Sequence, residues 1–165
     1  MIHIYTGDGK GKTTCAVGLA VRAAGAGKKV CFFQFLKDDT SGEIFALSQI
    51  NNIDVVSVGR QIPFLFDASE DEKTELKDFY KSKLTQILSA AEKYDVFIFD
   101  EAVCAVSEGI TDKDDILKFD KFGELILTGR GDISCMEACA DYITDMKKIK
   151  HPYDSGIPAR EGIEY

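Results

Sequence analysis

Short apolar runs recur along the chain and are separated by stretches with helical periodicity. Two continuous apolar runs, 29–36 and 95–100, are typical of strands buried on both faces of a parallel sheet. Shorter apolar segments predict four further strands, at 2–5, 53–58, 124–128 and 142–149.

Helices are expected between these strands. Residues 12–24 carry small and apolar side chains, and Gly25 and Gly27 follow them as a stop signal. A long charged helix is expected over 69–94, where Ser69 and Glu72 have the spacing of a capping box. Shorter helical stretches are expected at 41–50, 102–106, 113–122 and 134–140, and the tail from Lys150 is expected to be irregular.

The alternation of strands and helices predicts the fold class. It favours an α/β fold with a mostly parallel sheet and helices on both faces. The sequence shows no internal repeat, linker or low-complexity segment, and 165 residues suit a single hydrophobic core. We therefore expect one domain over residues 1–165.

Composition excludes several classes of partner. The net charge of −8 argues against a nucleic-acid-binding face and against an anionic membrane surface. No apolar run approaches the roughly 20 residues of a membrane span, and no signal-peptide pattern precedes the first strand. Five scattered cysteines favour reduced thiols, although the spacing of Cys135 and Cys139 leaves a metal pair open. We expect a cytoplasmic protein.

The segment from Gly7 to Thr14 lies between the first strand and the first helix, as a phosphate-binding P-loop requires. Its glycines allow backbone N–H groups to face an anion, and the helix N-terminus adds a positive dipole. Lys12 adds a full charge, and Thr13 or Thr14 offers a hydroxyl to Mg²⁺. The usual first glycine is replaced by Thr6, so the loop is a variant that weakens any inference to a kinase.

A second acidic element follows the apolar run that ends at Phe99. Asp100 and Glu101 come at the carboxyl end of this strand, where parallel sheets bind their ligands. Either carboxylate is a candidate ligand for Mg²⁺, directly or through water. Together with the P-loop, this element predicts a nucleotide site with a divalent cation.

Six segments together resemble one family, the ATP:corrinoid (cob(I)alamin) adenosyltransferases of the P-loop type. The segments that carry the resemblance are Gly7–Thr14 (Gly-Asp-Gly-Lys-Gly-Lys-Thr-Thr), Arg22, Gln34–Lys37 (Gln-Phe-Leu-Lys), Phe99–Glu101, Leu127–Arg130 (Leu-Thr-Gly-Arg), and the tail Lys150–Gly156 with Gly162–Tyr165. The similarity covers nearly the whole chain.

The resemblance implies a reaction of cobalamin biosynthesis. In the family, the Co(I) centre of a corrinoid attacks the 5′ carbon of ATP, and inorganic triphosphate leaves. The resemblance assigns ATP binding to Gly7, Asp8, Gly9, Lys10, Gly11, Lys12, Thr13, Thr14 and Arg22. It assigns Mg²⁺ or Mn²⁺ to Thr13 with Asp100 or Glu101, and charge neutralisation on the leaving triphosphate chiefly to Lys12.

The resemblance also implies a role for two aromatic side chains. Phe64 and Phe66 are similar to an aromatic pair that displaces the lower ligand of the corrinoid, although the second position is often tryptophan in relatives. A flavoprotein reductase and a second copy of the chain in a homodimer are the partners that the family implies.

Two other readings of the same motifs stay open at this stage. A nucleotide or small-molecule kinase would bind ATP in the usual pose and release a phosphorylated product. A non-catalytic regulatory module would bind ATP tightly and show no affinity for corrinoid. The tail and the Phe64–Phe66 segment favour the adenosyltransferase.

Overall fold

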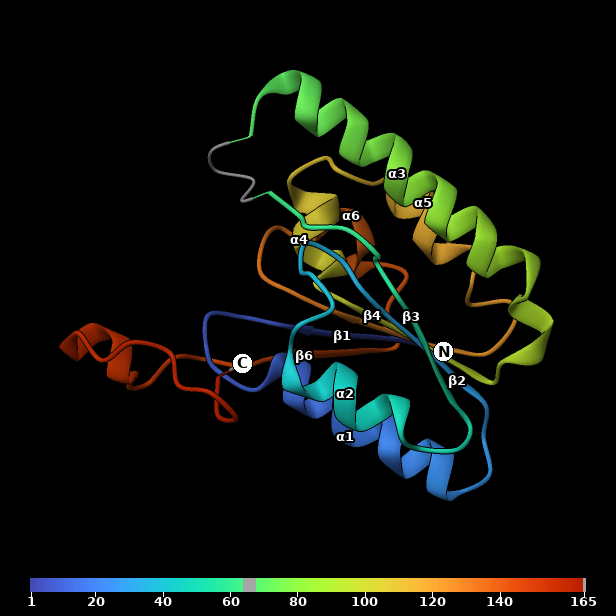
Figure 1. Ribbon diagram of the computed structural model, residues 1–165, viewed down its shortest axis with the longest axis horizontal. Helices are drawn as coiled ribbons and strands as arrows, with labels where there is room; N and C mark the ends of the chain where they lie inside the picture. The colour runs from blue at the N-terminus through green and yellow to red at the C-terminus, as the bar shows by residue number, and fades with distance from the viewer. Residues whose placement is uncertain (64–67, 165) are drawn as a thin grey trace.

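A single parallel sheet organises the molecule. The structure, a computed structural model, describes residues 1–63 and 68–164 (Figure 1). Its strands are β1 (Ile2–Thr6), β2 (Val30–Gln34), β3 (Ile53–Val56), β4 (Val96–Asp100), β5 (Glu124–Thr128) and β6 (Tyr142–Asp145). They form a six-stranded sheet in the order β3-β2-β4-β5-β1-β6, with every pairing parallel. The predicted α/β class is confirmed.

Helices cover both faces of this sheet, as predicted (Figure 1). One face carries α1 (Lys12–Gly25) and α2 (Gly42–Ser48). The other face carries α3 (Glu70–Ser89), α4 (Ala102–Ser107), α5 (Lys113–Leu117) and α6 (Ser134–Glu137). Two short 3₁₀ turns are η1 (Ala91–Lys93) and η2 (Pro152–Ser155). None of these helices is long and apolar enough to cross a bilayer.

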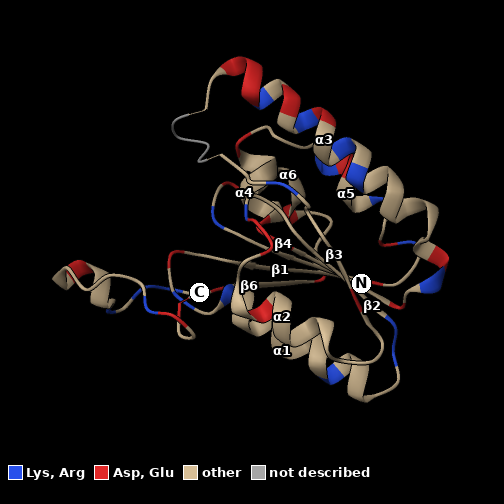
Figure 2. Ribbon diagram, in the orientation of Figure 1, with Lys and Arg blue, Asp and Glu red and all other residues tan. Residues whose placement is uncertain are grey.

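The two faces of the sheet are packed by different side chains. Under α1, the buried Ala16, Ala20 and Ala24 bring the helix close to the sheet. Under α3, the opposite face is aromatic, and buried Phe33 and Phe99 contact each other edge to face. Both faces of β2 and β4 are therefore apolar, which explains why these strands have continuous apolar sequences. Charged residues gather along α3 and in the loops rather than in the sheet interior (Figure 2).

Several predicted elements end earlier than the sequence pattern indicates, and three of them do so by four or five residues. The helix expected over 69–94 ends at Ser89, because the chain makes a 3₁₀ turn before it enters β4. The helix expected over 113–122 ends at Leu117. The strand expected over 142–149 ends at Asp145, because Met146 turns toward the P-loop and its carbonyl accepts a hydrogen bond from the Gly9 N–H.

The parallel arrangement brings all the strand ends that carry chemistry to one edge of the sheet. The turns after β1, β2, β4 and β5 contain the P-loop, Lys37, Glu101 and Arg130 respectively. The pairing of β2 with β4 places Gln34 beside Asp100. Side chains that are distant in sequence are thus neighbours in space, as the crevice at the carboxyl ends of parallel strands predicts.

The predicted capping box at the start of α3 is confirmed and leads to a stability test. The Ser69 hydroxyl accepts a hydrogen bond from the Glu72 N–H at 3.2 Å, and the Glu72 carboxylate accepts one from the Ser69 N–H at 2.8 Å. We expect Ser69→Ala to lower the free energy of unfolding by about 1 kcal/mol. Urea denaturation followed by circular dichroism measures this loss.

The matched control is Ser82→Ala, the same change at an exposed position inside the same helix. Alanine has the higher helix propensity there, so the control protein should be as stable as the parent or slightly more stable. Equal stability of all three proteins would mean that the capping box contributes nothing.

Candidate active site

The P-loop follows β1 directly and packs against the chain that leaves β6. Gly7 and Gly11 have φ angles of 101° and 114°, which glycine adopts without steric cost. The Gly9 N–H donates to the Met146 carbonyl at 2.6 Å, and a Cβ on Gly9 would lie 2.5 Å from the same oxygen. Glycine at these positions therefore lets the loop curl in front of α1 while residue 146 fixes its outer side.

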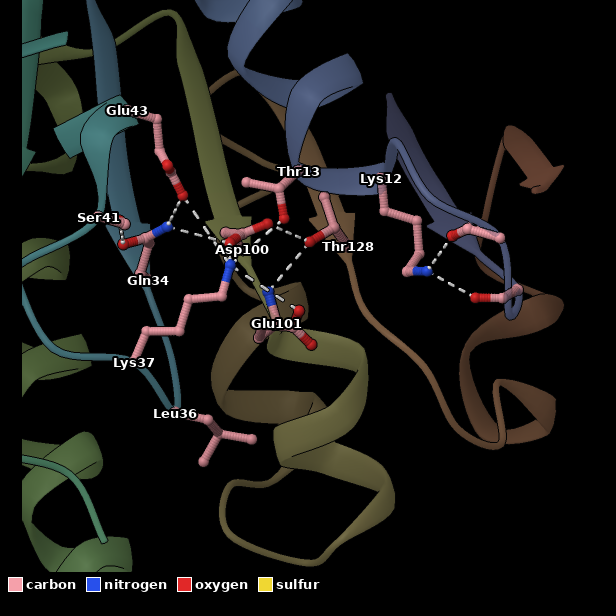
Figure 3. A network of polar contacts seen from close by, with 12 residues as sticks. Lys12, Thr13, Gln34, Leu36, Lys37, Ser41, Glu43, Asp100, Glu101 and Thr128 are labelled. Atoms are coloured by element: carbon pink, nitrogen blue, oxygen red, sulfur yellow. Dashed lines mark hydrogen bonds and ion pairs between the residues drawn. The ribbon is translucent and has the colours of Figure 1, made fainter. Parts of the chain in front are cut away.

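Lys12 is buried at the centre of this loop. Its side chain points back into the loop, and its ammonium donates to the carbonyl oxygens of Gly7 at 2.6 Å and Gly9 at 2.8 Å (Figure 3). Burial lowers the pKa of Lys12, and the positive charge of Arg130 lowers it further, while Glu101, Asp8 and Asp100 oppose the shift. The loop thus holds one amine in a fixed place at the N-terminus of α1, where an anion is also attracted by the helix dipole.

Asp100 ends β4 and is fully buried. One of its carboxylate oxygens accepts a hydrogen bond from the Thr128 hydroxyl at the end of β5. The other oxygen accepts hydrogen bonds from the ammonium of Lys37 at 2.9 Å and from the amide of Gln34 at 3.2 Å (Figure 3). Three neighbouring strands and the turn after one of them therefore meet at a single carboxylate.

Glu101 follows in a strained position at the start of α4. Its φ angle is 57°, in the left-handed region that non-glycine residues rarely adopt, and its N–H donates to the Thr128 hydroxyl oxygen at 3.0 Å. Burial raises the pKa of Glu101, the charge of Asp100 raises it further, and Lys37 and Lys12 oppose the shift. Strain of this kind is typical of residues held in place for function.

The oxygen atoms near Lys37 fit a hard divalent cation. The Lys37 ammonium lies 3.4 Å from the Thr13 hydroxyl, 2.9 Å from Asp100 and 4.0 Å from Glu101. Hydroxyl and carboxylate oxygens are the donors that Mg²⁺ prefers. Within residues 1–63 and 68–164, no three His, Cys, Asp or Glu side chains gather to hold a metal by themselves. The oxygens of this set could hold a cation together with phosphate and water, and the possible metal pair of Cys135 and Cys139 stays a prediction.

Two clefts flank the P-loop. One, of about 430 Å³, lies between α1, α2 and the end of the tail, and its lining includes Lys10, Thr13, Thr14, Lys37 and Glu43. The other, of about 490 Å³, lies at the ends of β1, β5 and β6 and is lined by Thr6–Asp8, Arg130, Gly131, Asp145 and Lys147–Ile149. Both volumes are within the range of small-molecule sites.

The structure brings most of the predicted site residues together. Asp8 lines one cleft, and Lys10, Thr13 and Thr14 line the other. Arg22 is different, because it is exposed in the last turn of α1, roughly 15 Å along the helix axis from Lys12. Its role in ATP binding stays a prediction. Phe64 and Phe66 lie outside the described residues.

Three further side chains belong to the site but were not assigned a role from the sequence. Lys37 and Thr128 contact Asp100 directly. Arg130 donates to the Asp8 carbonyl oxygen at 3.3 Å and lines the second cleft. All three lie at or just after the carboxyl end of a parallel strand, and that position is the signal that could have identified them.

The tail reaches from the second cleft to the first. It leaves the body beyond β6, as Figure 1 shows in red, and Gly162, Ile163 and Glu164 line the cleft beside Lys10 and Thr14. His151 accepts a hydrogen bond from the Tyr153 N–H at 3.2 Å and so caps η2. The tail is therefore part of the wall of the site.

Known proteins match the chain over its full length. The family model described as "ATP:corrinoid adenosyltransferase BtuR/CobO/CobP" matches residues 1–165. A corrinoid adenosyltransferase of Pseudomonas aeruginosa is 29% identical over 171 residues, covering 100% of this chain and 83% of the relative. Corrinoid adenosyltransferases of Escherichia coli K12 and Salmonella typhimurium are 26% and 27% identical, each covering 100% of this chain and 85% of the relative.

The matched family agrees with the P-loop, the acidic strand end and the sheet that joins them. It does not favour the kinase or the regulatory module among the readings that the sequence left open. The chain belongs to the ATP:corrinoid adenosyltransferase family.

Proposed function

We propose that this enzyme uses its P-loop to bind the triphosphate of ATP as a leaving group while the 5′ carbon faces a corrinoid. The Co(I) centre supplies the electron pair for the new Co–C5′ bond, the C5′–O5′ bond breaks, and triphosphate departs with the bonding pair. The observation that carries the proposal is the buried ammonium of Lys12, held by the carbonyl oxygens of Gly7 and Gly9. A fixed charge of this kind stabilises negative charge that develops on the leaving oxygen.

The protein does not need a nucleophile of its own for this reaction, because the reduced corrinoid is the nucleophile. Its task is to orient the two substrates and to neutralise the triphosphate. An ammonium has three N–H donors, and the loop carbonyls accept two of those of Lys12. The third is left for a triphosphate oxygen. The loop amides and Lys10 add further positive potential around it.

A divalent cation that accompanies ATP would be held by Thr13 with Asp100 or Glu101, and it would supply charge neutralisation to the triphosphate. The sequence left open whether Thr13 or Thr14 offers the hydroxyl. We assign this role to Thr13, because its hydroxyl lies 3.4 Å from the Lys37 ammonium, which also contacts Asp100. Mn²⁺ has similar ligand preferences and is expected to substitute.

Phe64 and Phe66 are proposed to act on the corrinoid rather than on ATP. In this proposal they displace the lower ligand of the cobalt, which makes the Co(II) form easier to reduce. The family resemblance supports this role, and bulk and apolarity are kept where relatives often have tryptophan. Cobalamin and its biosynthetic precursors are the candidate substrates.

We also propose that the enzyme works in the cytoplasm as a homodimer and receives its reduced corrinoid through a flavoprotein reductase. All five cysteines are free, which fits a reducing compartment. Tyr142 and Ile143 on the edge strand β6 are exposed and offer apolar surface to a second copy. Light scattering after size-exclusion chromatography measures the oligomeric state.

The activity itself is tested by incubating the protein with ATP, Mg²⁺ and chemically reduced cobalamin. The absorption spectrum of the cobalt should change to that of adenosylcobalamin. Formation of ADP without adenosylcobalamin would support the kinase instead. Tight ATP binding with no change in the cobalt spectrum would support the regulatory module.

Substitutions of Lys12 and Phe66 should affect different steps: Lys12 the adenosyl transfer to Co(I), and Phe66 the reduction of Co(II). With Co(I) supplied directly, we expect Lys12→Ala to lower kcat about 100-fold or more, because it removes the charge that stabilises the leaving group. Phe66→Ala should lower kcat far less under the same conditions, but it should slow the reaction strongly when Co(II) and a reductant are supplied. Stopped-flow absorption measures both rates.

The matched control is Lys81→Ala, which removes an exposed lysine from the middle of α3. It should leave both rates at the parent values. A larger loss for Phe66→Ala than for Lys12→Ala with Co(I) would show that their roles are assigned the wrong way round.

Thr13 and Thr14 allow the same substitution at adjacent positions. Thr13→Val should raise the Mg²⁺ concentration needed for half-maximal rate about tenfold or more, because it removes a cation ligand. Thr14→Val should change the Mg²⁺ requirement much less. Rates at fixed ATP over a range of Mg²⁺ concentrations measure both, and equal effects would contradict the assignment of the hydroxyl to Thr13.

A further inference from the structure

Lys37 brings the one charged side chain of the Gln34–Lys37 segment to the predicted cation position. Its ammonium lies 2.9 Å from Asp100, 3.4 Å from the Thr13 hydroxyl and 4.0 Å from both Glu101 and Glu43 (Figure 3). Thr13, Asp100 and Glu101 are the residues to which the sequence assigns a divalent cation. The lysine charge therefore lies where the charge of the metal is expected.

The backbone before Lys37 is fixed in a conformation that aims the side chain at this place. Leu36 has a φ angle of 57°, which is uncommon for a residue with a side chain. Its N–H donates to the hydroxyl oxygen of the buried Tyr80 at 2.7 Å, and the preceding Phe35 N–H donates to the Asp100 carbonyl at 2.9 Å. Packing from α3 and pairing with β4 thus hold the turn in place.

Charge balance explains why a lysine is stable there. Asp100 is fully buried, and a buried carboxylate is costly without an opposite charge. Burial by itself lowers the pKa of Lys37, but Asp100, Glu101 and Glu43 outweigh this effect, and the pKa of Lys37 is raised. The ammonium is therefore the counter-ion of three carboxylates.

We propose that Lys37 is a built-in substitute for the divalent cation: its ammonium fills the cation position in the nucleotide-free enzyme and leaves it when the metal arrives with ATP. An ammonium and a divalent cation cannot share this space, because like charges repel strongly at such distances. The metal alone must displace the lysine without compensation. When the metal arrives with ATP, the displacement of the lysine is compensated, because the triphosphate offers the lysine a new anionic partner.

The neighbouring cleft supplies the second position for the lysine. Lys37 is about a third exposed and lines the cleft that also contains Lys10 and Thr14, next to the P-loop. A rotation of its long side chain would carry the ammonium from the carboxylates toward the P-loop, to which the proposed function assigns the triphosphate. Metal and ATP would then each raise the affinity of the enzyme for the other, as linkage requires. The inference rests on the proposed function for the identity of the anion.

The test is binding of Mn²⁺ alone to the nucleotide-free enzyme, followed by the electron paramagnetic resonance signal of free Mn²⁺. Lys37→Met removes the charge and keeps much of the side-chain length. We expect it to bind Mn²⁺ about ten- to a hundredfold more tightly than the parent, because three carboxylates lose their counter-ion. Lys37→Arg keeps the charge and should bind Mn²⁺ as weakly as the parent.

The matched control is Lys118→Met, which removes a lysine that is paired with Asp115 at 2.7 Å and lies at the C-terminal end of α5. It should leave Mn²⁺ affinity unchanged. Unchanged or weaker binding of Mn²⁺ by folded Lys37→Met would overturn the proposal. Adenosyl transfer by the parent enzyme is assayed separately. If the parent enzyme is active and Lys37→Met shows no gain in Mn²⁺ affinity, this inference is refuted and the proposed function still stands.

A measurement on the parent enzyme keeps the proposal testable if Lys37→Met does not fold. The ε-carbon signal of Lys37 can be followed by NMR in protein labelled with ¹³C-lysine and assigned by its absence in Lys37→Arg. It should shift when ATP and Mg²⁺ are added together and stay in place with the same concentration of Mg²⁺ alone. No shift with both, or the full shift with Mg²⁺ alone, would overturn the proposal.

Discussion

The buried carboxylate of Asp100 is the constraint on which the rest of the site depends. It ends β4 with no exposure to solvent, so its charge and its lone pairs must be satisfied by the protein. The groups that satisfy it come from β2 and its turn on one side and from β5 on the other. Once these partners are in place, Thr13 of the P-loop, Glu101 and Lys37 lie around the same point, where we propose that a cation binds.

The second element of the site, Lys12, is held independently by the loop that it belongs to. Its bonds to Gly7 and Gly9 do not involve Asp100, and the loop is fixed in turn by the Met146 carbonyl. In the mechanism that we propose, the P-loop keeps the positive charge of Lys12 in a fixed place, and the positive charge of Lys37 beside the carboxylates is exchangeable. This division suits a reaction in which the triphosphate must be bound firmly, lose its bond to carbon and then be released.

Much of the fold could be predicted from the sequence, because β2 and β4 are apolar on both faces and the P-loop has its own pattern of glycines. The end of α3 at Ser89 could not be predicted: Ala90–Tyr94 are compatible with a helix, and only the entry into β4 stops it there. The turn of Met146 toward Gly9 depends on a contact between distant residues, and local pattern does not encode it.

The candidate site could likewise be predicted from the sequence only in part. Lys12, Thr13, Asp100 and Glu101 were predicted because each belongs to a motif with a known chemistry. The role of Lys37 was missed because its partner Asp100 is 63 residues away and becomes a neighbour only through the pairing of β2 with β4. The position of Arg22 in the last turn of α1 likewise becomes clear only once the length of the helix is known.

The central claim is that triphosphate leaves by cleavage of the bond between C5′ and its oxygen. ATP labelled with ¹⁸O at the 5′ bridging oxygen tests it most directly, in a single turnover with reduced cobalamin. Mass spectrometry of the products should find the label in inorganic triphosphate and none in the adenosyl group bound to cobalt. Label retained on the nucleoside would show that a bond to phosphorus breaks instead and would contradict this account.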